Sequence, residues 1–137
     1  MGNSVYEKTE RSRTELDRIS YLTIGAAIEV HRILGPGLLE SIYEEALCSE
    51  LVTRKLSFSR QVPTRVMYKQ HSVGEVRLDL VVCGQIVLEL KATDGIAPIH
   101  VAQLLSYLKA TRLRLGLLIN FNVAELRRGI KRLVLDV

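Results

Sequence analysis

The sequence has 137 residues, of which 47% are hydrophobic and 25% are charged, as expected for one globular domain rather than a disordered or fibrous chain. No apolar run approaches the roughly 18 residues of a membrane helix, and the first residues lack the apolar segment of a secretory signal. The formal net charge is +4, with a net of +5 in residues 101–137 and −1 in residues 1–100.

The first part of the chain reads as two helices. A Ser-Arg-Thr-Glu capping box predicts that the first helix begins at Ser12, after a polar segment that we expect to be flexible. The Gly35-Pro36-Gly37 stretch ends this helix, and apolar spacing predicts a second one from near Leu38 to about Lys55. The predicted division is a flexible segment 1–11 and a single domain 12–137.

Strand patterns follow these helices. Three β-prone segments are expected at 62–68, 76–82 and 86–91, with a tight connection at Gly84 between the last two. Helical spacing returns from about Pro98, and the nearly all-apolar run from Leu113 to Asn120 predicts a strand covered on both faces. A final amphipathic helix is expected from the spacing of Val123, Leu126, Ile130 and Leu133. The order α-α-β-β-β-α-β-α predicts an α/β fold with a mixed four-stranded sheet flanked by helices.

The predicted hairpin brings two acids together. If it is centred on Gly84, Asp79 lies directly opposite Glu89, with Cβ atoms roughly 5 Å apart. Lys91 then lies on the same face as Glu89. The other face is entirely apolar, and its members are Leu78, Leu80, Val82, Ile86, Leu88 and Leu90. Because like charges in this position repel, we expect that Asp79→Ala leaves the melting temperature unchanged or raises it.

Paired carboxylates beside a lysine are the groups that metal-assisted phosphodiester hydrolysis needs. Carboxylate oxygens bind Mg²⁺ or Mn²⁺, and such an ion polarises a phosphate and lowers the pKa of a bound water. The ammonium group of Lys91 can stabilise the charge that builds on phosphorus. A Glu–Lys pair on a solvated strand face is the alternative, and an E-x-K pattern by itself does not distinguish the two.

At these residues the sequence resembles the PD-(D/E)xK nucleases, whose signature is an Asp on one strand and E-x-K on the next. Here RLDLVV holds Asp79, and LELKA holds Glu89 and Lys91; Leu78 replaces the proline of the name. The chain also resembles the GxxExxY proteins, whose motif stands as Gly37-Leu-Leu-Glu40-Ser-Ile-Tyr43. Further matching stretches are RQVP (60–63), PIHVAQLLSYL (98–108) and GLLINFN (116–122).

The resemblance implies a restriction-endonuclease-like αβββαβ core and a divalent-metal-dependent nuclease. It implies Asp79 and Glu89 as ligands of Mg²⁺ or Mn²⁺, Lys91 as the catalytic lysine, and Glu40 as a further metal ligand. Gln103 and Tyr107 resemble a Q-x-x-x-Y helix motif and, four residues apart, share one helix face toward the site or substrate. The local departure is Gly74-Glu-Val-Arg-Leu-Asp79, which lacks the aromatic residue that often precedes the aspartate in that family.

Several assignments keep a structural alternative. Glu40 lies where a helix dipole favours an acid in any case. His31 and His100 are candidates to orient a carboxylate or contact phosphate, but a lone histidine is more often structural. Cys48 and Cys83 have no metal or redox spacing and are interpreted as reduced core thiols.

The expected partner is nucleic acid, DNA rather than RNA, with no membrane contact, and a homodimer or a partner protein is possible. The expected location is the cytoplasm. A second function of a different class stays open, a non-catalytic nucleic-acid-binding or protein-assembly module on the same fold. Its support is the scarcity of aromatic residues for base stacking, with two Phe and no Trp in the chain.

Overall fold

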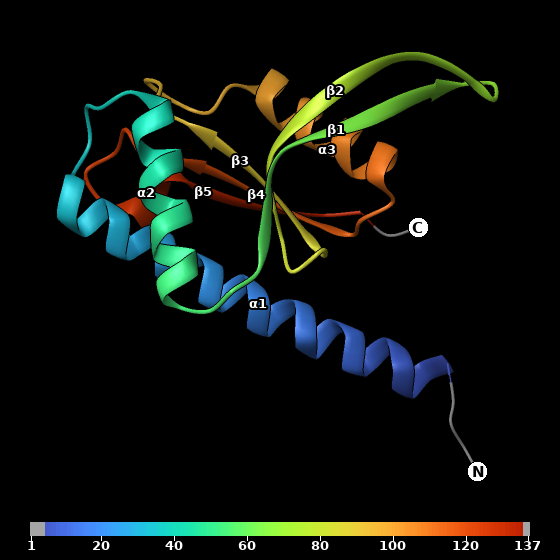
Figure 1. Ribbon diagram of the computed structural model, residues 1–137, viewed down its shortest axis with the longest axis horizontal. Helices are drawn as coiled ribbons and strands as arrows, with labels where there is room; N and C mark the ends of the chain where they lie inside the picture. Colours follow the sequence, from blue (N-terminus) through green and yellow to red (C-terminus); the bar gives the residue numbers. More distant parts are fainter. Residues whose placement is uncertain (1–4, 136–137) are drawn as a thin grey trace.

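The computed structural model describes the backbone of residues 5–135 and the side chains of residues 13–135. Its five strands form one mixed sheet in the order β1-β2-β3-β4-β5, in which only β3 and β4 run parallel (Figure 1). In chain order the elements are α1 (Val5–Leu34), α2 (Glu40–Thr53), β1 (Phe58–Tyr68), β2 (His71–Val82), β3 (Ile86–Lys91), α3 (Pro98–Thr111), β4 (Leu115–Asn120), the 3-10 helix η1 (Leu126–Gly129) and β5 (Ile130–Val134). No helix in this described part has both the length and the apolar character needed to cross a membrane.

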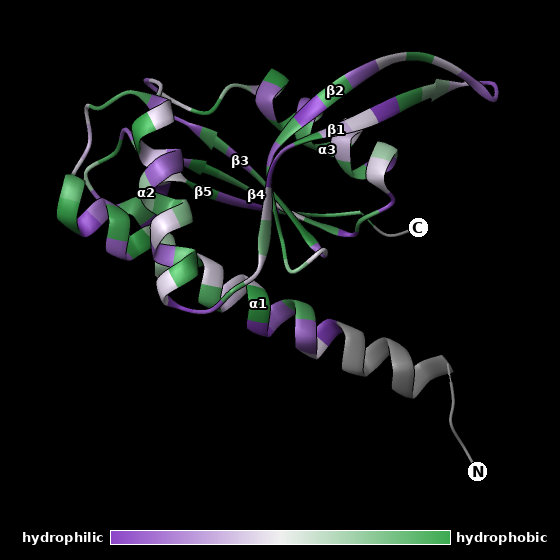
Figure 2. Cartoon of the chain, viewed as in Figure 1, coloured by the Kyte–Doolittle hydropathy of each residue, from purple (hydrophilic) through white to green (hydrophobic). Residues whose placement is uncertain are grey.

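The sheet has an apolar cluster on each face. On one face α1 and α2 pack against residues such as Leu80, Leu88 and Leu117, and on the other α3 packs against Val87 and Leu118. Every residue of β4 is buried, as expected for a strand covered on both sides, and Figure 2 shows β3 and β4 as mainly hydrophobic. The predicted mixed sheet between helices is therefore confirmed.

Two predicted elements differ from the structure. Helix α1 begins at Val5 rather than at Ser12, so the predicted start is wrong. Residues 1–4 lie outside the described residues, and the division into segment 1–11 and domain 12–137 stays a prediction.

The predicted last helix is also wrong, because Ile130–Val134 forms β5, a fifth strand antiparallel to β4. The turn before β5 requires glycine at position 129, because a Cβ there would overlap the carbonyl oxygen of Asn120. Pairing with β5 also satisfies the backbone groups along the outer edge of β4, which would otherwise be open.

The β1–β2 hairpin changes direction part of the way along its length. The ladder pairs Arg60 with Leu80 and Val62 with Leu78, but it does not pair the intervening Gln61 with Asp79. Gln61 has φ +47°, a conformation that a non-glycine residue rarely adopts. Beyond this point the hairpin extends away from the rest of the sheet (Figure 1).

Candidate active site

The two acids of the predicted hairpin meet where the β2–β3 ladder ends. Leu80 pairs with Leu88, Val81 with Val87 and Val82 with Ile86, which is the register centred on Gly84 that the sequence predicts. The next positions along this register are Asp79 and Glu89. The predicted apolar face differs from the structure at Leu78. The side chain of Leu78 belongs to the cluster around α3, whereas that of Leu80 belongs to the cluster on the opposite face of the sheet. The regular alternation of side chains is therefore interrupted at Asp79, where the hairpin bends.

At this point the carboxylates take the place of the ladder's backbone hydrogen bonds. The backbone N–H of Asp79 donates to Oε2 of Glu89 over 2.8 Å, and the backbone N–H of Leu90 donates to Oδ2 of Asp79 over 2.8 Å. Each acid thus has one oxygen held by the sheet. The second oxygen of Glu89 accepts no hydrogen bond from the residues 13–135, whereas the carboxylate of Asp79 also interacts with the side chain of Gln61. Glu89 is 4% exposed and Asp79 is half-buried.

Burial, with repulsion from a nearby acid in each case, makes both carboxyl groups hard to ionise. Burial, and then the negative charge of Asp79, raise the pKa of Glu89 to about 8. Burial also raises the pKa of Asp79, although the hydrogen bond from Leu90 acts in the opposite direction. An added positive charge between the two carboxylates would favour their ionised forms.

Lys91 and Glu40 complete the charged group. Lys91, half-buried at the end of β3, favours the ionised forms of Asp79, Glu89 and Glu40. Its ammonium group forms no direct ion pair with a carboxylate among the residues 13–135. Glu40 lies in the first turn of α2, and partial burial, followed by the charge of Asp79, raises its pKa.

Tyr43 fixes the turn that carries Glu40. Its hydroxyl donates to the carbonyl oxygen of Gly35 over 2.6 Å and accepts from the N–H of Leu38 over 3.1 Å. Its ring stacks on Phe121, with centroids 4.5 Å apart and planes 6° from parallel. Phe121 follows β4, so the glycine, glutamate and tyrosine of the Gly37–Tyr43 motif form one structural unit that attaches α2 to the sheet.

Sequence reasoning missed a polar group that links α2 to the bend. The side-chain amide of Gln61 donates to Glu44 over 3.0 Å and also lowers the pKa of Asp79 by hydrogen bonding. Arg60 forms ion pairs with Glu44 at 2.9 Å and with Glu45 at 3.0 Å. The RQVP stretch and the four-residue spacing of Glu40 and Glu44 were visible in the sequence, but their contact depends on the tertiary fold.

Four further residues were predicted for the site, and these are Tyr107, Gln103, His100 and His31. Of these four, Tyr107 interacts with the acids. Burial, and then the charges of Glu89 and Asp79, raise the pKa of Tyr107, which places its hydroxyl near them. Gln103 is exposed, and its side chain makes no hydrogen bond with the residues 13–135.

The two histidines have structural contacts instead. Nδ1 of His100 accepts from the backbone N–H of Ala97 and caps α3. His31 is buried, with Nε2 2.8 Å from the carbonyl oxygen of Val123, and its ring lies 6.4 Å from that of Phe121. Both sets of contacts match the structural alternative noted for a lone histidine.

The donor set fits a hard divalent cation. The carboxylate oxygens of Asp79 and Glu89 are the ligand type that Mg²⁺ and Mn²⁺ prefer. Within residues 13–135 no three His, Cys, Asp or Glu side chains converge into a ready-made metal cage. Mg²⁺ does not require such a cage, because it is usually held by one or two carboxylates and completes its shell with water and phosphate oxygens.

The free thiols complete the inventory of reactive side chains. Cys48 is buried in α2 and Cys83 is half-buried in the turn between β2 and β3, and neither forms a disulfide. Burial raises the pKa of the Cys48 thiol, which makes it a poor nucleophile. The carboxylates and Lys91 are therefore the groups with which this site can perform chemistry.

Comparison with known proteins agrees with this geometry. A model of the PD-(D/E)XK nuclease superfamily matches residues 17–133, a span that contains both acids, Lys91 and every strand except the last residue of β5. Searches of the curated proteins and of the solved structures found no significant match. The acids on adjacent strands, the lysine two residues after the second acid, and the matched span agree: the chain belongs to the PD-(D/E)XK nuclease superfamily.

Proposed function

We propose that this domain is a divalent-metal-dependent nuclease that hydrolyses phosphodiester bonds, with DNA as its substrate. The observation that carries the proposal is the carboxylate pair at the end of the β2–β3 ladder, in which the backbone of the sheet holds only one oxygen of each acid and Glu89 has a pKa of about 8. A purely structural pair would be more stable with one amide in place of one acid, because burying two carboxylates side by side costs free energy.

The roles follow from the positions of the side chains. Asp79 and Glu89 would hold Mg²⁺ or Mn²⁺ through the oxygens that the backbone of the sheet does not hold, with Glu40 as an accessory ligand from α2. Such an ion polarises a phosphate and lowers the pKa of a bound water. Lys91 would stabilise the negative charge that develops on the phosphate oxygens. Tyr107 approaches the acids from α3 and would contact the substrate, with Gln103 on the same helix face.

The proton on Glu89 links metal binding to pH. Glu89 must lose this proton before its second oxygen can bind a cation, so binding releases a proton and strengthens as the pH rises toward 8. The chain resembles the GxxExxY proteins through the Gly37–Tyr43 motif, and the contacts of Tyr43 support a role for this motif in positioning Glu40.

The test is cleavage of labelled single- and double-stranded DNA and RNA in Mg²⁺, Mn²⁺ or EDTA. We expect metal-dependent cleavage of DNA by the wild type and a loss of at least about 100-fold in Asp79→Asn and in Glu89→Gln. Glu75→Gln, an exposed acid of the hairpin, is the matched control and should cleave as the wild type does. Equal cleavage by wild type and Glu89→Gln would indicate a contaminating enzyme and contradict the proposal.

The alternative is a non-catalytic binding module on the same fold. The absence of a three-ligand cage within residues 13–135 is the observation that favours it. Nucleic-acid binding that persists in EDTA, without cleavage in any divalent metal, would support this alternative over the nuclease.

A further inference from the structure

Three hollows on the surface of the molecule share some of the residues that line them. The first lies between the β1–β2 hairpin and α3, has a volume of about 340 Å³ and is lined by Arg65, Lys109 and Arg112 among others. The second, of about 140 Å³, is lined by Arg112 and Arg114. The third, of about 290 Å³, is lined by Arg114 and Arg13. Because Arg112 and Arg114 each belong to two of them, the hollows adjoin one another at these two arginines.

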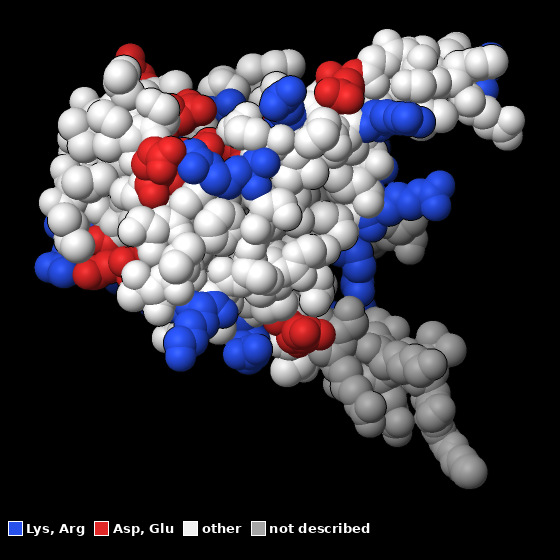
Figure 3. Space-filling model, in the orientation of Figure 1, with Lys and Arg blue, Asp and Glu red and all other residues white. Residues whose placement is uncertain are grey.

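Six cations of the residues 13–135 line these hollows, and Arg132 is paired with Asp17. We call the other five the basic belt: Arg65, Lys109, Arg112, Arg114 and Arg13. They come from four elements or their ends, namely β1, α3 and the residue after it, the start of β4, and α1. Figure 3 shows Lys and Arg side chains along one side of the molecule, from the hairpin down toward the N-terminal helix.

Among the residues 13–135 the cations of the belt have no acidic partner. None of the five forms an ion pair within this range. The only acid of the same range that lines the three hollows is Asp17, and it pairs with Arg132 over 2.6 Å. By contrast, most other described arginines form ion pairs, and these are Arg32, Arg54, Arg60, Arg128 and Arg132.

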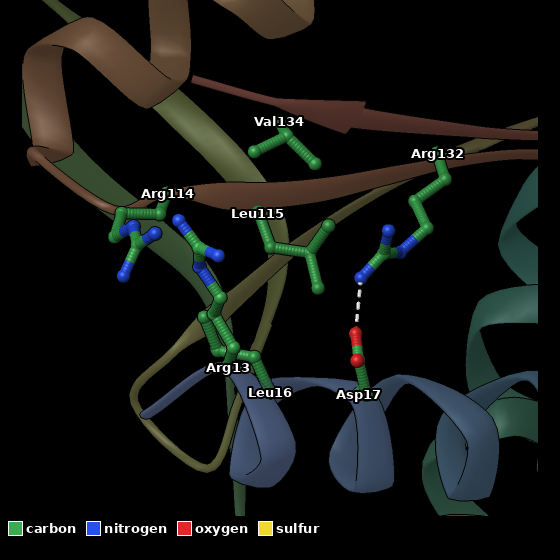
Figure 4. Close-up of a pocket in the computed structure, with 7 residues that line it drawn as sticks. All are labelled: Arg13, Leu16, Asp17, Arg114, Leu115, Arg132 and Val134. Atoms are coloured by element: carbon green, nitrogen blue, oxygen red, sulfur yellow. Dashed lines mark hydrogen bonds and ion pairs between the residues drawn. The ribbon is translucent and has the colours of Figure 1, made fainter. Parts of the chain in front are cut away.

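Two of the guanidinium groups lie together. In the third hollow Arg13 and Arg114 extend along the same side toward one another, while Arg132 and its partner Asp17 occupy the other side (Figure 4). Leu16 and Leu115 lie between these two sides of the hollow. Two like charges held in this way repel each other, and an anion between them would remove the repulsion.

Helix geometry explains only part of this charge. Lys109 lies in the last turn of α3 and Arg112 is its C-terminal cap, where cations are favoured by the helix dipole. Arg65 lies on a strand, Arg114 precedes β4, and Arg13 is inside α1. The dipole of one helix does not account for unpaired cations that continue across several elements.

We propose that the basic belt binds the phosphodiester backbone of a nucleic-acid strand. Guanidinium groups donate paired hydrogen bonds to phosphate oxygens, and a row of separate hollows fits a polymer with regularly spaced charges better than a single small anion. The choice of nucleic acid over another polyanion rests on the proposed function.

The belt also begins close to the acids. Helix α3 carries Tyr107, whose pKa is raised by burial and then by the charges of Glu89 and Asp79. Tyr107 is next in sequence to Ser106, which lines the first hollow. Along β1, Arg65 lies four residues from Gln61, which is roughly 13 Å in an extended strand. A strand whose scissile phosphate lies at the acids would therefore continue into the belt.

The test compares two triple variants with the same change of charge. Arg13→Gln/Arg65→Gln/Arg112→Gln removes three exposed cations of the belt. Lys55→Gln/Arg127→Gln/Lys131→Gln removes three exposed cations that line none of its hollows and form no ion pair within residues 13–135. The affinity of each protein for a fluorescent single-stranded DNA oligonucleotide, and for the matching duplex, is measured by anisotropy in EDTA, after thermal melts show that both variants are folded.

Counterion release gives the expected size of the effect. Five phosphate contacts on a single strand predict a slope of log affinity against log salt of about −3.5, and therefore a loss of affinity of roughly 100-fold between about 50 and 200 mM salt. The belt variant retains two of the five cations, so its loss over this range should be less than about tenfold, and its affinity at low salt should be much weaker. The control variant should match the wild type.

Other results would overturn the proposal. Equal weakening in both variants would show diffuse attraction by net charge, and no weakening in the belt variant would show that the belt is not used. Binding to phosphatidylserine vesicles, lost in the belt variant, without binding to either oligonucleotide would assign the belt to a membrane surface. Glu89→Gln separates the two proposals: it should lose cleavage and keep belt-dependent binding, so a failure of cleavage alone leaves the belt intact.

Discussion

The elevated pKa of Glu89 predicts that the protein becomes less stable as the pH rises. Its ordinary value is near 4.5 and its value in the folded protein is about 8, so the folded state holds this proton more tightly than the unfolded chain does. Ionisation therefore favours unfolding. The stability that is present below about pH 5 is lost as the pH rises through 8, at about 1.4 kcal/mol for each pH unit.

Replacing the acid by its amide should remove this dependence. At pH 7 the linkage relation gives a gain of up to about 3 kcal/mol for Glu89→Gln over the wild type, since the amide oxygen can still accept the N–H of Asp79. At pH 5 the two proteins should be nearly equal in stability. The raised pKa of Asp79 acts in the same direction, so some dependence on pH should remain in the variant.

The assay is urea unfolding of both proteins at intervals from pH 5 to 9 in EDTA, with Glu75→Gln as the control that should follow the wild type. A wild-type stability that is flat across this range, or a Glu89→Gln variant that is less stable than the wild type at pH 8, would refute the reasoning. Added Mn²⁺ should raise the stability of the wild type at pH 8 but not that of the variant, because ligand binding to the folded state stabilises it.

Three further predictions concern the cation, the fold and a histidine. Calorimetry should detect Mn²⁺ binding to the wild type that strengthens by roughly 50-fold from pH 6 to 8 as Glu89 loses its proton, and that is absent in Asp79→Asn; binding that does not vary with pH would contradict the assignment. Gly129→Ala should lower the free energy of unfolding by more than about 3 kcal/mol, because its Cβ would overlap the carbonyl oxygen of Asn120, whereas Gly95→Ala, with open space around it, should be nearly neutral in urea unfolding. His31→Ala should cost about 1–3 kcal/mol through the lost contact with Val123 and leave cleavage by the folded protein unchanged, and a specific loss of cleavage would return His31 to the site.

The sequence predicted the structure correctly where the interactions that determine it lie between residues close together in the chain. Gly84 at the tight connection determines the register of β2 and β3, and therefore the meeting of Asp79 and Glu89, because a two-stranded hairpin is defined by its turn. The burial of β4 follows from its uninterrupted apolar run. The site could thus be predicted to the level of which acids face each other.

Non-local contacts account for what the sequence did not reveal. The Ile130–Val134 segment has apolar residues spaced for a helix, yet it forms a strand because the edge of β4 needs a hydrogen-bonding partner. The contact of Gln61 with Glu44 brings together residues from β1 and α2. It lies at a bend in β1 that no local sequence pattern predicts. The slip of Leu78 to the α3 face is part of the same bend.

The hydrogen bonds of the two carboxylates also change how a loss of function in this chain should be interpreted. Because Asp79 accepts the N–H of Leu90 and Glu89 accepts the N–H of Asp79, alanine at either position leaves a backbone donor without a partner, which costs about 1–3 kcal/mol. This loss opposes the gain expected from the relief of repulsion alone, so Asn and Gln are the informative substitutions. Over evolution, a descendant that had abandoned hydrolysis would still be under selection to keep an oxygen acceptor at both positions. The persistence of an oxygen acceptor at both positions in a lineage would then record the architecture of the sheet, whereas the persistence of both acids would record the chemistry performed on it.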